Sequence, residues 1–146
     1  MEQPNYVDID DLVVAIGDLL AGLGVFKDVV YSTATDTGQL LEEMEAASPP
    51  AAIVGIGEIE YDERGIQRTL KPLVVIVDAF RRGGKRRCES VWTLAKAAEG
   101  LFQARPGNGG FREILGIEFT LAGVRPLALS GALAAVAITL EGVEFV

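Results

Sequence analysis

The sequence predicts an α+β domain in which three helices pack on a mainly antiparallel or mixed β-sheet of about five strands. Segments with apolar residues at helical spacing alternate along the chain with short β-branched runs. Turn signals at "DERG" and "RPLALSG" favour hairpins between neighbouring strands. A chain of 146 residues can bury one hydrophobic core but not two. We therefore expect a single domain over residues 1–146, with the element order α-β-α-β-β-α-β-β.

The first helix is expected directly after Asp8, which has the side chain of an N-cap residue. Asp10 and Asp11 would place carboxylates in the first turn, where the helix dipole favours them, and Gly24 would end the helix. The residues at helical spacing are Ile9, Leu12, Val13, Ile16, Leu19, Leu20 and Leu23. The β-branched and aromatic segment that follows, residues 25–32, is typical of a strand.

A second helix is predicted from Asp36, because "DTGQ" resembles a capping box in which Gln39 reaches back towards the cap. Ser48, Pro49 and Pro50 would end it. Its expected apolar face consists of Leu40, Leu41, Met44 and Ala47.

Two strands should follow, joined by a hairpin turn at "DERG". Residues 51–61 are apolar in their first half and alternating in their second, which indicates a strand that leaves the sheet interior towards solvent. Residues 67–80 contain the most apolar run, "LVVIVDAF". Within that strand Pro72 lacks a ladder donor, so we expect an edge position or a bulge there.

A third helix and two final strands complete the expected fold. The helix would bury Cys88, Val91, Trp92, Ala95, Ala98, Leu101 and Phe102. The strands would cover roughly residues 111–124 and 132–145. The apolar segment 126–140 is shorter than the roughly 20 residues of a membrane-spanning helix, so we interpret it as a buried strand with its turn.

Charge is strongly polarised along the chain. Residues 1–63 contain fourteen acids and one base, whereas residues 64–146 contain seven acids and twelve bases, so net charges of −13 and +5 sum to −8. An acidic total argues against a general nucleic-acid binder. The chain has no histidine, which argues against hydrolytic triads and common zinc or iron sites, and its one cysteine excludes an internal disulfide. We expect no cofactor and no metal. The acidic N-terminal segment lacks the layout of a signal peptide, so we also expect no export.

Three groups of residues are candidates for chemical sites. Glu58, Glu60 and Asp62 alternate along one strand face and could hold a hard cation, although a solvated strand end and hairpin is favoured because no calcium-loop spacing is present. Asp78 could be a functional carboxylate at a strand end, but a structural role there is favoured. Cys88 is expected to be a buried thiol, since no histidine can activate it.

A basic cluster lies between the long apolar strand and the third helix. It consists of Arg81, Arg82, Lys85, Arg86 and Arg87. Cations at or just before a helix start are mildly unfavourable, so local stability does not account for them. One interpretation is an exposed loop without further role. The other is a partner surface for a phosphate backbone or an acidic protein face, and the first 63 residues of a neighbouring copy would provide such a face in a ring.

The whole order of elements resembles the tail-terminator and tail-completion proteins of tailed phages and Mu-like prophages. The resemblance rests on "DDLVVAIGDLLAGLG", "LLEEMEAASPPAAIVGIG", "PLVVIVDAF", "ESVWTLAKAAEGLF" and "LAAVAITLEGVEF", which together follow nearly all of the chain. It carries no catalytic signature.

The resemblance implies a non-enzymatic structural protein of the virion, assembled in the host cytoplasm. Such a protein forms a homo-oligomeric ring, usually a hexamer, that caps the tail tube, contacts the tube protein and a neck or head-completion protein, and lets DNA pass through its lumen. By analogy, Arg81 to Arg87 would lie at a subunit or tube interface. Two alternatives stay open: a small oligomeric ligand-binding or regulatory domain whose basic loop takes an anionic metabolite, and an enzyme that uses Asp78 or the three strand carboxylates with a divalent metal.

Overall fold

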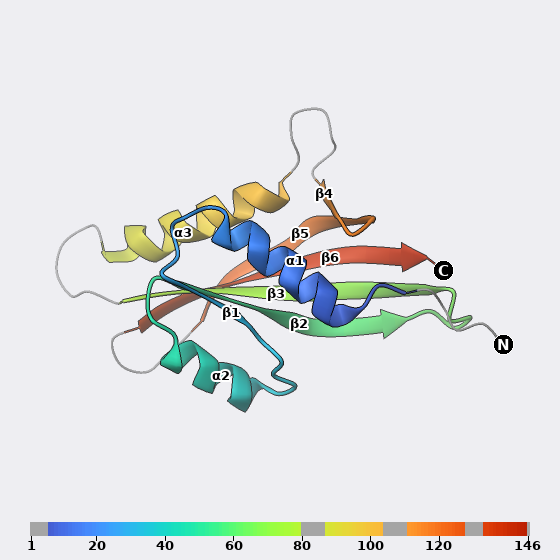
Figure 1. The fold of residues 1–146 in the computed structure, drawn as a ribbon, viewed down its shortest axis with the longest axis horizontal. Coiled ribbons are helices and arrows are strands. Elements are labelled where there is room, and N and C mark those ends of the chain that lie inside the picture. Colours follow the sequence, from blue (N-terminus) through green and yellow to red (C-terminus); the bar gives the residue numbers. More distant parts are fainter. Residues whose placement is uncertain (1–5, 80–86, 104–110, 128–132, 146) are drawn as a thin grey trace.

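A six-stranded sheet runs through the molecule, with α1 and α3 on one face and α2 on the other (Figure 1). The computed structural model describes residues 6–79, 87–103, 111–127 and 133–145, and only these are discussed. In chain order the elements are α1 (Ile9–Ala21), β1 (Asp28–Tyr31), α2 (Thr37–Ala46), β2 (Ala51–Tyr61), β3 (Gln67–Ala79), α3 (Arg87–Phe102), β4 (Phe111–Ile114), β5 (Ile117–Leu127) and β6 (Leu133–Phe145).

The α+β prediction is confirmed, and the sheet is mixed. Its strand order is β1-β2-β3-β6-β5-β4. Only β1 pairs in parallel, with β2, while all other pairs are antiparallel. The predicted hairpin at "DERG" joins β2 to β3. The second predicted hairpin connection, residues 128–132, lies outside the described residues, although β5 and β6 pair as that prediction requires.

The expectation of about five strands differs from the six found. The segment predicted as one strand over residues 111–124 is divided into β4 and β5 by a two-residue turn at Leu115 and Gly116. Both turn residues have positive φ, 53° and 81°, as tight antiparallel hairpins require. The sequence signal was weak because Leu115 is not a residue that usually adopts this conformation.

Pro72 lies in a central strand, so the edge interpretation is wrong and the bulge interpretation is confirmed. β3 is flanked by β2 and β6, and Pro72 is opposite Ile56. The register of β2 shifts between Ile56 and Glu58, which places the bulge at Gly57 beside the proline. The pairing of β3 with β6 also skips Lys71 and Pro72, so the ladder is irregular on both sides of the proline, which has no N–H to donate.

The predicted caps of the first two helices are confirmed. The Asp8 side chain accepts from the backbone N–H of Asp10 at 2.8 Å, and α1 ends at Ala21 with Gly22 as C-cap, slightly earlier than predicted. The Asp36 side chain accepts from the N–H of Gln39 at 2.8 Å. The Gln39 side chain in turn accepts from the N–H of Thr35, one residue before the cap residue that a capping box would use.

The core has two layers, one on each face of the sheet. On the first face α1 and α3 bury Leu12, Ile16, Leu20, Ala95, Ala98 and Phe102 against the sheet. On the second face α2 contributes Met44 and the adjoining Ala47, which pack on Ala51, Ile53, Val75, Val77 and Ala135. Two predicted core residues are wrong: Leu41 and Trp92 are 40% and 42% exposed. The side chain of Cys88 lies outside the described residues.

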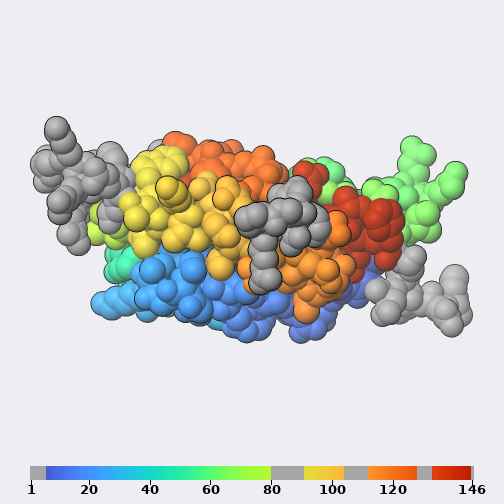
Figure 2. All heavy atoms as spheres, turned by 90° about the horizontal axis from the view of Figure 1, so that it is seen from above, coloured from blue at the N-terminus to red at the C-terminus, as the bar shows by residue number. Residues whose placement is uncertain are grey.

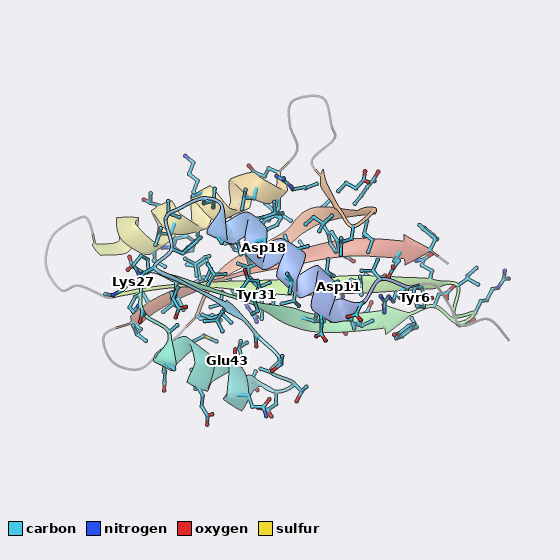
Figure 3. The ribbon with its side chains drawn as sticks, in the orientation of Figure 1. Tyr6, Asp11, Asp18, Lys27, Tyr31 and Glu43 are labelled. Carbon is cyan, nitrogen blue, oxygen red and sulfur yellow. The ribbon has the colours of Figure 1, made fainter. Side chains whose placement is uncertain are left out.

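The edge strand β1 is fastened to α1 through a tyrosine. The Tyr31 hydroxyl donates to Asp18 Oδ1 at 2.7 Å, and Figure 3 shows the two side chains meeting between strand and helix. Gly17 allows this approach, because a Cβ at that position would lie 2.2 Å from the Tyr31 ring. The glycine is therefore needed for close packing of strand and helix.

The two outer strands each pair with only four of the eleven residues of the strand beside them. β1 pairs with Ala51–Val54, so the remainder of β2, Gly55–Tyr61, has no outer partner strand among the described residues. β4 pairs with Ile117–Thr120, so Leu121–Leu127 of β5 likewise has no outer partner strand there. We refer to these two stretches as the free segments of β2 and β5.

Candidate assembly surface

The predicted basic cluster falls almost entirely outside the described part of the chain. Arg81, Arg82, Lys85 and Arg86 lie in the connection between β3 and α3, for which no structure is described. Arg87 is the first residue of α3, but its side chain is not described. Its role as a partner surface therefore stays a prediction.

The strand carboxylates Glu58 and Glu60 do project together, as their alternation predicts, but they share a lysine. Lys71 Nζ lies 3.5 Å from Glu58 Oε2 and 3.3 Å from Glu60 Oε1. The hydrogen bond from Lys71 to Glu60 raises the pKa of the lysine above its ordinary value. The side chain of Asp62 instead stabilises the hairpin, because it accepts a hydrogen bond from the N–H of Gln67 at 3.2 Å.

This arrangement agrees with the favoured interpretation of a solvated strand end and hairpin. No group of three or more acidic or cysteine side chains that could hold a metal ion occurs among the described residues. Sequence reasoning missed Lys71 as the shared partner. Its position opposite Glu58 depends on the bulge at Gly57, and the sequence carries no signal for the register that results.

Asp78 lies where β3 ends and is nearly buried, with 7% exposure. Its carboxylate accepts from the N–H of the following residue, Ala79, at 2.8 Å, and it takes part in a further interaction. The geometry matches the favoured prediction of a structural carboxylate at a strand end.

A buried ion pair that sequence reasoning missed fastens the chain before α1 to the sheet. Arg68 Nε donates to Glu144 Oε1 at 2.6 Å, and the side chains are 6% and 7% exposed. Val7 completes the arrangement: its N–H donates to Glu144 Oε2 at 2.6 Å, and its carbonyl accepts from Arg68. Burial is the largest single effect and would lower the pKa of Arg68, but the interactions with Glu144 and Tyr61 together raise it above its ordinary value.

Tyr6 extends the same contact towards the hairpin. Its ring lies 4.4 Å from the Arg68 guanidinium carbon, and its hydroxyl donates to the Gly65 carbonyl at 2.6 Å. Tyr6 also meets Tyr61 edge to face, with ring centres 6.1 Å apart. The Tyr6 bond joins residues 59 positions apart in sequence and the Val7–Glu144 bond residues 137 apart, which is why no local pattern predicted them.

Large apolar side chains are exposed at this same end of the sheet. Tyr61 is 60% exposed, Ile66 52% and Phe145 70%, and Val143 beside them is 38% exposed. They belong to the end of β2, the hairpin and the end of β6, which lie next to one another in Figure 2. We name these four residues the apolar tip. By the strand register Tyr61 lies on the α1 face of the sheet and Val143 and Phe145 on the other face, so both faces of this end expose apolar side chains. Large apolar side chains exposed close to one another are typical of a surface that another protein covers.

A notch of about 300 Å³ lies where β1 diverges from β2. It is lined by Ser32, Ala34, Thr35, Asp36, Thr37, Leu40, Gly55, Ile56, Gly57 and Leu73. Hydroxyl groups and one carboxylate form its polar part, and none of these described lining residues is basic. The notch therefore does not have the chemistry that binds an anion.

Comparison with protein-family models gives no match for this chain, and comparison with curated proteins gives none either. None of the helices in the described ranges is long and apolar enough to cross a membrane.

Proposed function

We propose that the chain is a structural subunit of a phage or prophage virion, a tail-terminator or tail-completion protein. In this proposal identical copies form a ring, most simply a hexamer, on the last layer of the tail tube. The ring contacts the tube protein on one side and a neck or head-completion protein on the other, and DNA passes through its lumen. The protein performs no catalysis and resides in the virion after assembly in the host cytoplasm.

The observation that carries the proposal is the apolar tip. Four large apolar side chains are 38–70% exposed at one end of the sheet, next to a buried ion pair that connects β3 to β6 there. A surface of this kind suits permanent contact with another protein. Because it lies at the ends of the long strands, the bound protein would sit beyond that end of the sheet. The order of elements, which resembles tail terminators, supports the same assignment.

A small ligand-binding domain is the second candidate, and one observation favours it. The notch beside β1 is large enough for a small molecule, since ligand pockets begin at about 300 Å³. Its hydroxyl and carboxylate lining suits a neutral or cationic ligand rather than the anionic metabolite that a basic loop would select. Thermal stabilisation by phosphate, sulfate or nucleotides would favour the anion-binding alternative over the proposal.

The proposal is tested by removing the chain from the phage or prophage that encodes it. Loss of a tail terminator should leave tails of uncontrolled length that fail to join capsids, visible by electron microscopy. The intact chain should be found in purified particles by mass spectrometry. The proposal would be contradicted if purified wild-type particles lacked the chain. It would also be contradicted if tails kept their normal length and joined capsids after the chain was removed.

The basic cluster provides a matched variant for the same assay. Replacing Arg81, Arg82, Lys85, Arg86 and Arg87 with serine should leave the melting temperature unchanged but impair assembly or tail joining. As a control, Lys96→Ser removes one exposed charge from α3, away from the apolar tip, and should have no effect. Normal tail joining in the five-residue variant would favour the other interpretation, in which the cluster is an exposed loop without further role.

A further inference from the structure

We propose that copies of this chain join edge to edge, with the free segment of β2 in one copy pairing antiparallel with the free segment of β5 in the next. This inference rests on the proposed ring and specifies which surfaces form it. It is carried by four features of the two segments: their open backbone, their length, their side-chain chemistry and their stagger.

Both segments expose strand edges inside an otherwise paired sheet. Gly55–Tyr61 and Leu121–Leu127 each contain seven residues. Each lies on the outer side of its strand beyond the end of a four-residue neighbour, β1 or β4. Unpaired backbone N–H and C=O groups at such an edge are a template for another strand. In the register given below, six residues of each segment can pair, and the first residues of the β2 segment, Gly55–Gly57, also line the notch beside β1.

The two segments lie towards opposite edges of the sheet. Their pairing is therefore heterologous, because it joins two different surfaces of the chain. One copy would present β2 and the next copy β5, and the joined pair would still have one free segment of each kind. Such a contact repeats from copy to copy and closes into a ring if the rotation between copies allows. In copies of the same orientation β2 and β5 run in opposite directions, because three antiparallel pairings separate them. The new pairing is therefore antiparallel.

Side chains on the two segments match in charge. Glu58 and Glu60 share the single cation of Lys71, which leaves one negative charge among the three groups. Arg125, in the free segment of β5, is exposed and makes no ion pair with any described residue. The strand pairings across the sheet place Arg125 on the same face as Glu58 and Glu60. One positive charge on β5 thus meets one uncompensated negative charge on β2.

In one register, opposite charges pair on one face of the sheet and apolar side chains pair on the other. If Val124 of one copy lies opposite Ile59 of the next, Arg125 falls opposite Glu58. Val124 and Ile59 each pack against the α1 and α3 side of their own core, so this register continues one apolar face across the junction. Cβ atoms of directly opposite residues lie about 4.5–5.5 Å apart, close enough for an ion pair between Arg125 and Glu58. Pro126, which has no N–H, then faces the bulged Gly57, where a regular ladder is already interrupted.

The stagger between the segments is compatible with closure. In this register Ile59, which is level with Leu70 of β3, pairs with Val124, which is level with Val74 through Ile138. Four residues correspond to about 13 Å along the strands, and the repeat from one copy's β2 to the next, four strand spacings, is about 19 Å. Strands would then incline by roughly 35° to the ring axis, at the lower end of the 35–45° of closed barrels.

Disulfide trapping tests the pairing. In a Cys88→Ser background, Glu58→Cys with Arg125→Cys should give, on oxidation, a ladder of covalent oligomers that ends at the size of the ring. Glu58→Cys with Lys96→Cys is the matched control, because Lys96 is exposed on α3, away from both free segments. A ladder no stronger than that control, in protein whose native mass is still that of a ring, would overturn edge pairing and leave the proposed ring standing.

A charge exchange keeps the test independent of Cys88. Arg125→Glu should raise the protein concentration needed for half-assembly by roughly tenfold, because it places like charges opposite one another. Adding Glu58→Arg to the same chain should restore assembly. Assembly that is insensitive to both changes would overturn the pairing. Protein that stays monomeric at every concentration, with or without a tail tube, would overturn the pairing and the proposed function together.

Discussion

Arg68 Nε lies 2.6 Å from Glu144 Oε1, and this buried ion pair fixes β3 to β6 at the end of the sheet that carries the apolar tip. The same two side chains bind both backbone polar groups of Val7 and so hold the chain that enters α1. One pair therefore connects three segments that are far apart in sequence.

The first prediction concerns Glu144. Glu144→Gln should lower the free energy of unfolding by about 3–5 kcal/mol, because it leaves the Arg68 charge buried without its partner. Glu141→Gln changes an exposed carboxylate on the same strand and should have an effect within about 0.5 kcal/mol. Urea denaturation measures both. Equal effects for the two variants would show that the buried pair contributes nothing beyond surface charge.

The second prediction concerns pH. The hydrogen bond from the Tyr31 hydroxyl to Asp18, together with burial, raises the pKa of Tyr31 above its ordinary value of 10.0. A group whose pKa is raised in the folded state stabilises the fold fully below its unfolded pKa and ceases to do so as pH rises through the folded value. The stability that wild type has over Tyr31→Phe should thus be constant at neutral pH and shrink above about pH 10.

Melting temperatures of the two proteins across this range test the assignment. Other groups that titrate there, including Lys71, are present in both proteins and cancel in the difference. Asp18→Asn should move the onset of tyrosinate absorbance to lower pH, since it removes the carboxylate that accepts the bond. A stability difference between wild type and Tyr31→Phe that grows at high pH would contradict a raised pKa for Tyr31.

The third prediction concerns a close approach between β5 and β6. A Cβ at Gly142 would lie 2.6 Å from the ring of Phe119, which is fully buried. Gly142→Ala should therefore lower the free energy of unfolding by about 1–3 kcal/mol. Gly100, in α3, has open space at its Cβ position, and Gly100→Ala should stabilise by up to about 1 kcal/mol. Destabilisation of similar size in both variants would contradict the steric explanation.

The fourth prediction concerns divalent cations. Lys71 Nζ occupies the space between Glu58 and Glu60, so magnesium, manganese and calcium should leave the melting temperature unchanged. A ligand that binds the folded state raises the melting temperature once its concentration exceeds the dissociation constant. A concentration-dependent rise with any of the three ions would favour the metal-dependent alternative. Lys71→Gln would then be expected to strengthen the binding.

The sequence predicted most elements because their signals are local. Asp8 and Asp36 cap the helices that they were expected to cap, and the apolar run of β3 lies at the centre of the sheet. The errors concern residues whose helical spacing is compatible with either burial or exposure. Leu41 and Trp92 have the correct helical spacing for burial, but the rest of the described chain leaves both side chains partly exposed.

The candidate surfaces were less predictable, because they depend on register and on chain order in the sheet. Lys71 meets Glu58 only through the bulge at Gly57, and Arg68 meets Glu144 only because β3 and β6 are neighbours. The free segments likewise follow from how far β1 and β4 extend, which no residue pattern within β2 or β5 specifies. The basic cluster was visible in the sequence, but Arg81 to Arg86 lie outside the described residues.

Absolute mass in solution, by native mass spectrometry with light scattering across a salt series, tests the ring most directly. We predict one discrete closed oligomer, most simply a hexamer, that loosens at high salt because charge pairs contribute to its contacts. Should the chain alone be monomeric, a tail tube is predicted to nucleate the same ring. A salt-independent dimer, or a monomer that a tail tube leaves unchanged, would contradict the proposed ring.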